Sequence, residues 1–300
     1  MTDIERVGVV GCGLMGAGIA EVCARAGVPV TVVERDGRAA RSGRLRITRS
    51  LDRAAAHGRL TDDHRDTAAA LITVTDQIEA LHDRDLVIEA VAEDERLKLD
   101  VFARLDAVLQ GEHALLATNT SSIPVIRLAA ATSRPDRVVG VHFFNPVPVL
   151  RLVELVPSLL TSPGTVARAE TFVTGTLGKE VVRTRDRAGF VVNALLVPYL
   201  LAAIRMVESG GASVEDIDRG MVLGCAHPLG PLALTDLIGL DTTRAIAESL
   251  YAEFREPLYS PPPLLSRMVE AGLLGRKSGR GFHTYDELPG PEPTASAGRP

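Results

Sequence analysis

Three glycines follow a short apolar run near the start of the chain, and their spacing is typical of a turn that binds a dinucleotide. The run from Arg6 to Val10 leads directly into the glycines and then into a helical pattern. In such a turn the first glycine allows a tight bend, the second lets the backbone approach a pyrophosphate, and the third lets the helix pack on the strand. The N–H groups at the start of the helix also attract the anion. The residues expected to contact the cofactor here are Gly11, Gly13, Leu14, Met15 and Gly16.

An acidic residue at the end of the next predicted strand favours NAD as the dinucleotide. The apolar run Val30 to Val33 is followed by Glu34, close to the offset expected for a carboxylate that accepts hydrogen bonds from the adenosine ribose. The same carboxylate repels a 2′-phosphate, although Arg35 beside it leaves NADP as the alternative. A glycine-rich turn in some other α/β protein is the weaker interpretation, because strand, turn, helix and acid occur together.

A second group of polar residues lies in two later runs, ATNTSSIPV and GVHFFNPVPVLRLVEL, which place His142 and Glu154 at neighbouring strand ends. The prolines of Asn145-Pro146 and at Pro148 let the chain reverse between the two strands, so that the two side chains can meet. Oxidation of a secondary alcohol needs a group that takes the hydroxyl proton while hydride leaves the same carbon, and an imidazole suits that task near neutral pH.

Motifs spread over most of the chain resemble those of the short-chain 3-hydroxyacyl-CoA dehydrogenases. They are Gly11 to Ala20, Glu89-Ala90 with Glu93, Asn119 to Ser122, His142 to Pro148, GFVVN ending at Asn193, HPLGP from His227, and GRKSGRGF ending at Phe282. They occur in the family's order over about residues 5 to 285. The resemblance implies reversible, NAD-dependent oxidation of a (3S)-hydroxyacyl-CoA to the 3-ketoacyl-CoA. A single chain of this length resembles the free-standing enzymes that act on short chains such as 3-hydroxybutyryl-CoA.

The resemblance also implies roles for four side chains. His142 is expected to be the general base, and Glu154 is expected to fix which imidazole nitrogen is free. Ser121 and Asn193 match polar residues at the reacting oxygen, where they would polarise a ketone and bind substrate. Both also have a structural interpretation: Ser121, with Ser122, could cap a nearby helix, and Asn193 could satisfy backbone groups at a helix start.

Four further positions match family contacts to cofactor or substrate. Glu93, Lys98 and Asn145 resemble residues that contact the cofactor or, for Asn145, also the thioester end of the substrate. For Lys98 a solvated helix face is the alternative. Ser50 matches a serine that the family's helical insertion presents to the coenzyme A nucleotide.

The chain departs from the family at several positions, which leaves the acyl carrier open. His57 falls where the family has a lysine in the insertion, so that Arg49, Arg53 and Arg59 either contact phosphate or form a solvated face. A 3-hydroxyacyl group on an acyl carrier protein is therefore an alternative substrate, with a basic surface formed by Arg41, Arg44, Arg46 and Arg49. The other departures are Ala188, Ala194, Ala226 and His283.

A third interpretation, from another class, is a non-catalytic NADH-binding protein similar to the lambda-crystallins. The presence of Ser121, His142, Glu154 and Asn193 together argues against it.

Composition limits the class of protein. The 300 residues are 46% hydrophobic and 24% charged, with a net charge of -5, which is ordinary for a globular protein and gives no reason to expect nucleic acid as a partner. Cys12, Cys23 and Cys225 form no CxxC motif, so we expect neither disulfides nor a metal site, and a cytoplasmic location fits. The apolar run Phe190 to Val207 contains Asn193 and Pro198 and is expected to be a buried helix rather than a membrane span.

The patterning predicts a two-domain protein. Residues 1–187 read as a Rossmann-type, doubly wound, mostly parallel sheet with a projecting helical pair inserted at about 37–70, and residues 188–285 read as an all-helical domain. The resemblance implies that this helical domain serves substrate binding and dimerisation. A disordered tail is expected over 286–300. We expect a homodimer through the helical domain. The predicted strands are Arg6 to Val10, Val30 to Val33, Leu86 to Ala90, Leu115 to Thr118, Arg137 to Val141 and Leu152 to Leu155.

The remaining histidines are not expected to take part in chemistry. His227 is expected to hold a turn of the helical domain by hydrogen bonds. The others are predicted to lie on the surface: His57, His64, His82, His113 and His283.

Overall fold

The structure is a computed structural model that describes residues 3–285, which form two compact units divided between Val191 and Val192. The tail predicted over 286–300 lies outside the described residues.

The first unit is built on one eight-stranded sheet with the order β3-β2-β1-β4-β5-β6-β7-β8. Its strands are β1 (Val7–Val10), β2 (Val30–Val33), β3 (Ile72–Thr75), β4 (Leu86–Glu89), β5 (Leu115–Thr118), β6 (Val138–Phe143), β7 (Leu152–Pro157) and β8 (Glu180–Arg183). Every neighbouring pair is parallel except β6 and β7, which are antiparallel. The predicted mostly parallel, doubly wound sheet is confirmed.

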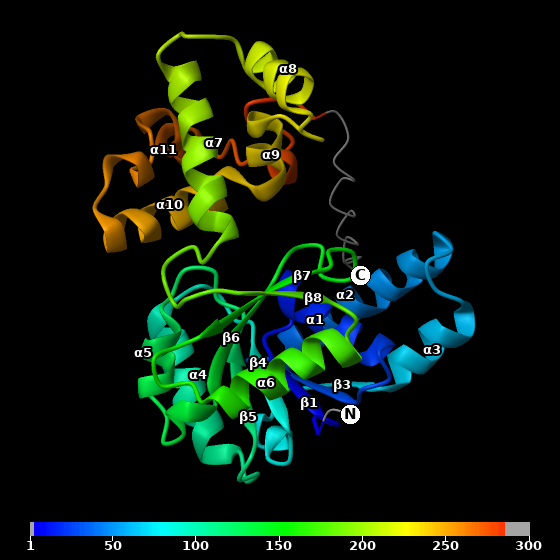
Figure 1. Cartoon of the computed structure of the whole chain (residues 1–300). Helices are drawn as coiled ribbons and strands as arrows, with labels where there is room; N and C mark the ends of the chain where they lie inside the picture. The colour runs from blue at the N-terminus through cyan, green and yellow to red at the C-terminus, as the bar shows by residue number, and fades with distance from the viewer. Residues whose placement is uncertain (1–2, 286–300) are drawn as a thin grey trace, which may run out of the picture. The chain divides into compact units, whose positions relative to one another are not determined.

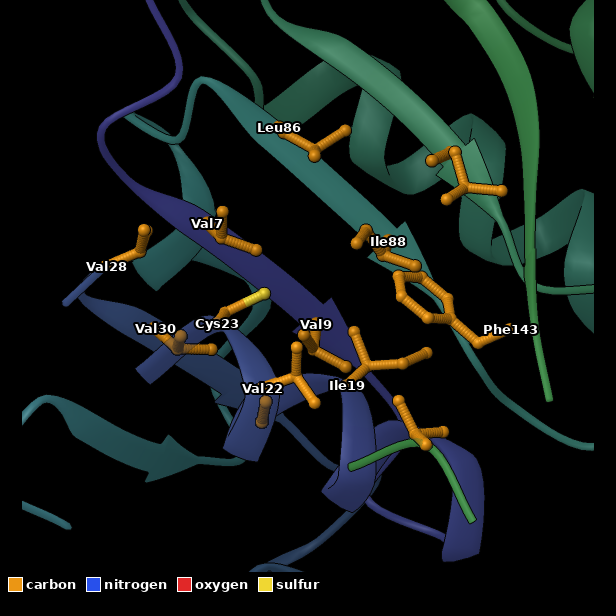
Figure 2. Packing of buried hydrophobic residues seen from close by; sticks show 14 of the residues in the cluster. Val7, Val9, Ile19, Val22, Cys23, Val28, Val30, Leu86, Ile88 and Phe143 are labelled. Carbon is orange, nitrogen blue, oxygen red and sulfur yellow. The ribbon is translucent and has the colours of Figure 1, made fainter. Parts of the chain in front are cut away.

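Helices cover both faces of this sheet because its inner strands are apolar on both sides. The helices of this unit are α1 (Leu14–Arg25), α2 (Gly37–Ala56), α3 (Asp62–Ala70), α4 (Glu95–Val108), α5 (Val125–Ala130) and α6 (Pro163–Thr171). Figure 2 shows one of the two packed clusters, in which Ile19, Val22 and Cys23 of α1 lie against Val7 and Val9 of β1. This packing fixes the start of α1, and hence the glycine turn, at the carboxyl end of β1.

Two strands were not predicted from the sequence, and both lie at an edge of the sheet. Strands β3 and β8 each pair on one side only and leave several side chains partly or fully exposed. Their residues therefore lack the continuous apolar character of inner strands. Strands β6 and β7 each extend two residues beyond their predicted ends, to Phe143 and Pro157.

The helical insertion forms a pair, α2 and α3, which Figure 1 shows beside the β3 edge of the sheet. The side chain of Asp36 accepts a hydrogen bond from Ala39 N at 2.7 Å at the start of α2, and Thr61 accepts one from His64 N at 3.2 Å at the start of α3. Both are N-cap contacts that satisfy free helix N–H groups. The predicted helical pair is therefore confirmed.

The second unit is mainly helical in its described part, with two isolated β-bridges between Gly275 and Thr284. It contains α7 (Val192–Glu208), α8 (Val214–Cys225), α9 (Pro231–Ile238), α10 (Leu240–Phe254) and α11 (Pro263–Glu270). No helix within residues 3–285 is both long and apolar enough to cross a membrane. The predicted apolar helix corresponds to α7, whose buried face is made by Val197, Leu200, Leu201, Ala203 and Ile204.

One predicted surface histidine belongs instead to the internal bonding of the second unit. His283 is half-buried, and its Nε2 lies 2.8 Å from Oδ2 of Asp218, which also accepts the N–H group of Ala233. The prediction failed because the neighbouring polar residues gave no sign of a buried carboxylate. His57, His64, His82 and His113 are exposed, as predicted.

Candidate active site

The glycine turn has the geometry that a bound pyrophosphate requires. Gly11 has φ +91°, a conformation that side chains disfavour, and a Cβ at Gly16 would lie 1.9 Å from the carbonyl oxygen of Gly11. At Gly13 a Cβ would meet nothing within 4 Å. No side chain caps the start of α1, so its N–H groups face the turn without a side-chain acceptor. The turn therefore offers both the close approach and the donors that an anion needs.

A cavity of about 1100 Å³ opens next to the turn, at the carboxyl ends of β1, β2 and β4. Glu34 lines it, and its Oε1 accepts a hydrogen bond from Cys12 N at 2.6 Å, so the carboxylate is held beside the turn. Arg35 also lines the cavity, but its side chain is highly exposed and pairs with Asp36 at 3.2 Å. The residues present fit an NAD molecule whose pyrophosphate lies at the turn and whose ribose lies at Glu34.

We expect Gly16→Ala and Gly13→Ala to fail in different ways, because only one of the two positions is crowded in the protein itself. Gly16→Ala forces its Cβ against backbone and should lower the free energy of unfolding by about 3 kcal/mol. Gly13→Ala should keep the stability of the wild type and weaken NADH binding by at least about tenfold, since its Cβ would occupy the approach of the pyrophosphate. Urea denaturation and NADH fluorescence titration measure the two effects. An equal loss of stability in both variants contradicts this division.

His142 and Glu154 face each other across the one antiparallel pair of the sheet. They are direct register partners in β6 and β7, and Nδ1 of His142 lies 2.8 Å from Oε2 of Glu154. Their relative exposures are 6% and 0%. An ionised carboxylate can only accept a hydrogen bond, so this contact places the proton on Nδ1. Among residues 3–285 no hydrogen bond is made to Nε2, which is the nitrogen that a base would use.

Ser121 and Ser122 bind a carboxylate rather than capping a helix. Oε1 of Glu93 accepts hydrogen bonds from Ser121 N at 2.8 Å and from Ser122 N at 3.1 Å, and both serine hydroxyls also lie within 3.3 Å of it. The interpretation of these serines as caps is wrong, because α5 begins only at Val125 and has no cap from either one. Burial alone would raise the pKa of Glu93, but the Lys98 ammonium and the hydrogen bonds outweigh it and lower the pKa.

Lys98 is buried, so its interpretation as part of a solvated helix face is wrong. Its relative exposure is 1%, and its Nζ lies 2.6 Å from Oε1 of Glu89 and 3.2 Å from Oε2 of Glu93. Oε2 of Glu89 accepts a further hydrogen bond from the Thr118 hydroxyl at 2.8 Å. Sequence reasoning gave Glu89 no role of its own, although a carboxylate at the end of a fully buried strand was a signal that it needs a cation.

Lys98→Met is expected to lower the free energy of unfolding by about 3 to 5 kcal/mol, because it leaves the fully buried Glu89 without a counter-charge. Arg127→Met is a matched control: Arg127 also pairs with a glutamate of α4, Glu95, at 2.8 Å, but both side chains are exposed, so its loss should cost no more than about 1 kcal/mol. Urea denaturation compares the two. Equal costs would show that the buried pair does not stabilise the fold.

The other predicted site residues lie elsewhere. Asn145 is exposed in the loop between β6 and β7, and Asn193 lies in α7 of the second unit. Ser50 is half-buried on α2, and His57 ends that helix with Nδ1 2.7 Å from the Arg53 carbonyl. A hollow of about 350 Å³ on α2 is lined by Ser42, Leu45, Arg46, Arg49 and Arg53.

Two further observations bound the site. Neither His142 nor Ser121 lines the large cavity beside the glycine turn, so that cavity accounts for the adenosine and pyrophosphate part of a dinucleotide only. In the described residues no three His, Cys, Asp or Glu side chains are grouped as ligands for a metal ion.

His227 forms a hydrogen bond within the second unit. Its Nδ1 lies 3.2 Å from the hydroxyl oxygen of Tyr199.

Comparison with known proteins identifies relatives over nearly the whole chain. Residues 6–187 match the family described as "3-hydroxyacyl-CoA dehydrogenase, NAD binding domain", and residues 189–285 match the corresponding C-terminal domain. The 3-hydroxybutyryl-CoA dehydrogenase of Mycobacterium tuberculosis is 60% identical over 286 residues, covering 95% of this chain and 100% of that protein.

Solved structures agree with these matches. The crystal structure of FadB2 from M. tuberculosis has a TM-score of 0.93 and 60% identity, covering 94% of this chain and 99% of the other. That of (S)-3-hydroxybutyryl-CoA dehydrogenase from Ralstonia eutropha has a TM-score of 0.89 and 45% identity, covering 95% and 100%.

Proposed function

The chain belongs to the 3-hydroxyacyl-CoA dehydrogenase family, and from that premise we propose that this NAD-dependent oxidoreductase acts on short (3S)-3-hydroxyacyl-CoA thioesters such as 3-hydroxybutyryl-CoA. The observation that carries the reaction type is the buried pair of His142 and Glu154 in the same unit as a dinucleotide turn. The short acyl chain is supported by the names of the two relatives of known substrate described above.

We propose that His142 is the general base of the oxidation. NAD held at the glycine turn and Glu34 would supply the acceptor for the hydride of the substrate's hydroxyl-bearing carbon. Nε2 of His142 takes the hydroxyl proton, and Glu154 holds the opposite nitrogen protonated and stabilises the imidazolium that results. In the reverse direction the same imidazolium returns the proton to the ketone oxygen.

We propose supporting roles for the remaining residues. Glu93 orders the loop that carries Ser121, whose hydroxyl would polarise the reacting oxygen. For Asn193 we keep the substrate-binding role that the family resemblance implies. Asn145 would contact cofactor and substrate from the loop between β6 and β7. This loop joins the strands that carry His142 and Glu154, a pair called the dyad from here on. Ser50 and the arginines of α2 would bind the coenzyme A nucleotide.

The two alternative functions are less well supported. The relatives described above are named for coenzyme A thioesters, which favours coenzyme A over a carrier protein. The carboxylate of Glu154 orients the imidazole of His142 as in a general-base pair, which favours an enzyme over a crystallin-like NADH-binding protein.

The direct test is reduction of acetoacetyl-CoA, followed by consumption of NADH at 340 nm. We expect turnover with NADH and much less with NADPH, because Glu34 would repel a 2′-phosphate. The same acyl group on an acyl carrier protein should be a poor substrate. Binding of NADH without turnover of either thioester would reject the proposed function.

We further propose that the second unit, taken from about residue 188, is the substrate and dimerisation domain, and that the enzyme works in the cytoplasm as a homodimer. The second unit exposes large apolar side chains, among them Leu195, Leu223 and Leu237, which a partner would bury. All three cysteines are free, as expected in a reducing compartment. A mass twice that of one chain in light scattering at micromolar concentration supports the dimer, and the mass of one chain rejects it.

A further inference from the structure

We propose that Phe190 is a positioning residue for the imidazole of His142, held for that purpose in a left-handed backbone conformation. The inference rests on the proposed function in which His142 is the base. It adds a residue that neither touches the proton in transit nor belongs to the hydrogen-bonded pair. Three independent observations carry it: a ring contact, a strained backbone and two anchors on either side.

The ring contact is direct. The centroid of the Phe190 ring lies 5.5 Å from that of His142 at an interplanar angle of 61°, an edge-to-face arrangement. Phe144 makes a second, tilted contact at 4.6 Å. Aromatic pairs with inclined planes at such distances are favourable. Together the rings of Phe190 and Phe144 restrict rotation of the imidazole about its side-chain bonds. Glu154 fixes one nitrogen of His142, and the two rings fix the plane.

The backbone of Phe190 is strained, which is a second observation that this segment is held in place. Its φ is +49°, one of three positive values at non-glycine residues in the described chain. A bulky side chain is rare in this region because Cβ crowds the carbonyl, and such conformations persist only where surrounding contacts enforce them. Gly189 just before it has φ +74°, so the chain turns sharply at this point. A glycine at 190 would meet the same geometry without strain.

Hydrogen bonds before and after Phe190 hold its backbone in this conformation. The carboxylate of Asp186 accepts hydrogen bonds from Val125 N at 2.8 Å and Ile126 N at 2.7 Å, at the start of α5. On the other side Val191 N donates to Oε1 of Glu154 at 3.0 Å. Phe190 thus lies between an anchor on α5 and an anchor on the dyad itself.

The Phe190 side chain is also packed against other buried residues of the core. It is 8% exposed and belongs to the cluster that includes Phe102, Val125 and Leu128 under α4 and α5. The imidazole therefore contacts a ring that is part of the packed core, and the low compressibility of that core holds the ring in place. A misplacement of the base by a fraction of an ångström reduces the rate of proton transfer without affecting cofactor binding at the distant glycine turn.

The test compares Phe190→Leu, Phe190→Gly and the matched control Phe102→Leu, which makes the same change in the same cluster without touching the dyad. We expect Phe190→Leu to lower kcat for acetoacetyl-CoA by about 10- to 100-fold while KM for NADH stays within about twofold. Phe102→Leu should lose stability but keep kcat. Phe190→Gly relieves the strain and removes the ring, so it should lose as much kcat as Phe190→Leu.

A readout that needs no substrate separates this inference from the proposed function. The ring protons of His142, assigned by their loss in His142→Gln, should shift in the NMR spectrum of Phe190→Leu and stay in place in Phe102→Leu. If wild type lacks turnover, the proposed function fails, while the spectrum still tests the contact. Wild-type kcat in Phe190→Leu, full kcat in Phe190→Gly, or unmoved His142 signals would each overturn the role of Phe190.

Discussion

His142→Gln is expected to reduce kcat for acetoacetyl-CoA reduction by about 10³-fold. An amide neither takes nor releases a proton near neutral pH, while glutamine keeps a similar length and hydrogen-bonding capacity. Its carboxamide can still donate to Oε2 of Glu154, so the buried carboxylate keeps a partner. The NADH affinity should therefore stay near that of the wild type, which fluorescence titration measures together with steady-state rates.

His82→Gln provides the control for this experiment. His82 is exposed in the same unit, and its Nδ1 lies 3.0 Å from a backbone carbonyl oxygen, so it has a hydrogen bond to lose but no contact with the dyad. Its kcat should equal that of the wild type. Turnover of His142→Gln within about tenfold of the wild type would remove His142 from the role of base.

Glu154→Gln is expected to lower kcat for the oxidation of 3-hydroxybutyryl-CoA by about 10²- to 10⁴-fold, although it changes only one non-hydrogen atom. Val191 N donates to Oε1 at 3.0 Å, so the amide oxygen of glutamine should keep that position as an acceptor. The amide nitrogen then faces Nδ1 of His142 and donates to it. That contact moves the imidazole proton to Nε2, where it blocks the nitrogen that must accept the substrate's proton.

Glu180→Gln is the matched control on the adjacent strand. Glu180 pairs with Arg151 at 2.8 Å, but both side chains are largely exposed, so the charge contributes little. Both variants and the wild type should be compared in kcat and in thermal unfolding. Full activity of Glu154→Gln with unchanged stability would show that the tautomer of His142 is set by something other than Glu154.

The fold was predictable where burial is complete. Strands β1, β2, β4 and β5 are apolar at nearly every position and lie within the sheet, and the sequence predicts each of them to within about one residue. Strands β3 and β8 were not predicted, because edge strands bury one side and carry polar residues such as Thr73 and Glu180. Tertiary pairing, rather than local pattern, makes them strands.

The pairing of His142 with Glu154 could be predicted because the chain visibly turns back between them. Two prolines between His142 and Glu154 indicated a return of the chain, and the register of β6 and β7 follows from it. The partner of Lys98 was not predictable, because Lys98 lies in α4, nine positions after Glu89 at the end of β4, and only the fold brings the two together. The left-handed conformation of Phe190 has no local signal either, since a phenylalanine predicts the opposite.

The direct pairing of His142 with Glu154 in the antiparallel ladder ties the loss of the dyad on heating to the unfolding of the sheet. His142 lies on β6 and Glu154 on β7, which are bonded to each other, and β7 is itself held between β6 and β8. Local fraying cannot separate the two side chains, because their spacing is set by main-chain hydrogen bonds inside the sheet. The amide protons of this ladder should exchange with solvent only through cooperative opening of the whole first unit, the slowest class of exchange in a protein. Heat should therefore abolish the dyad and the sheet's circular dichroism in a single step.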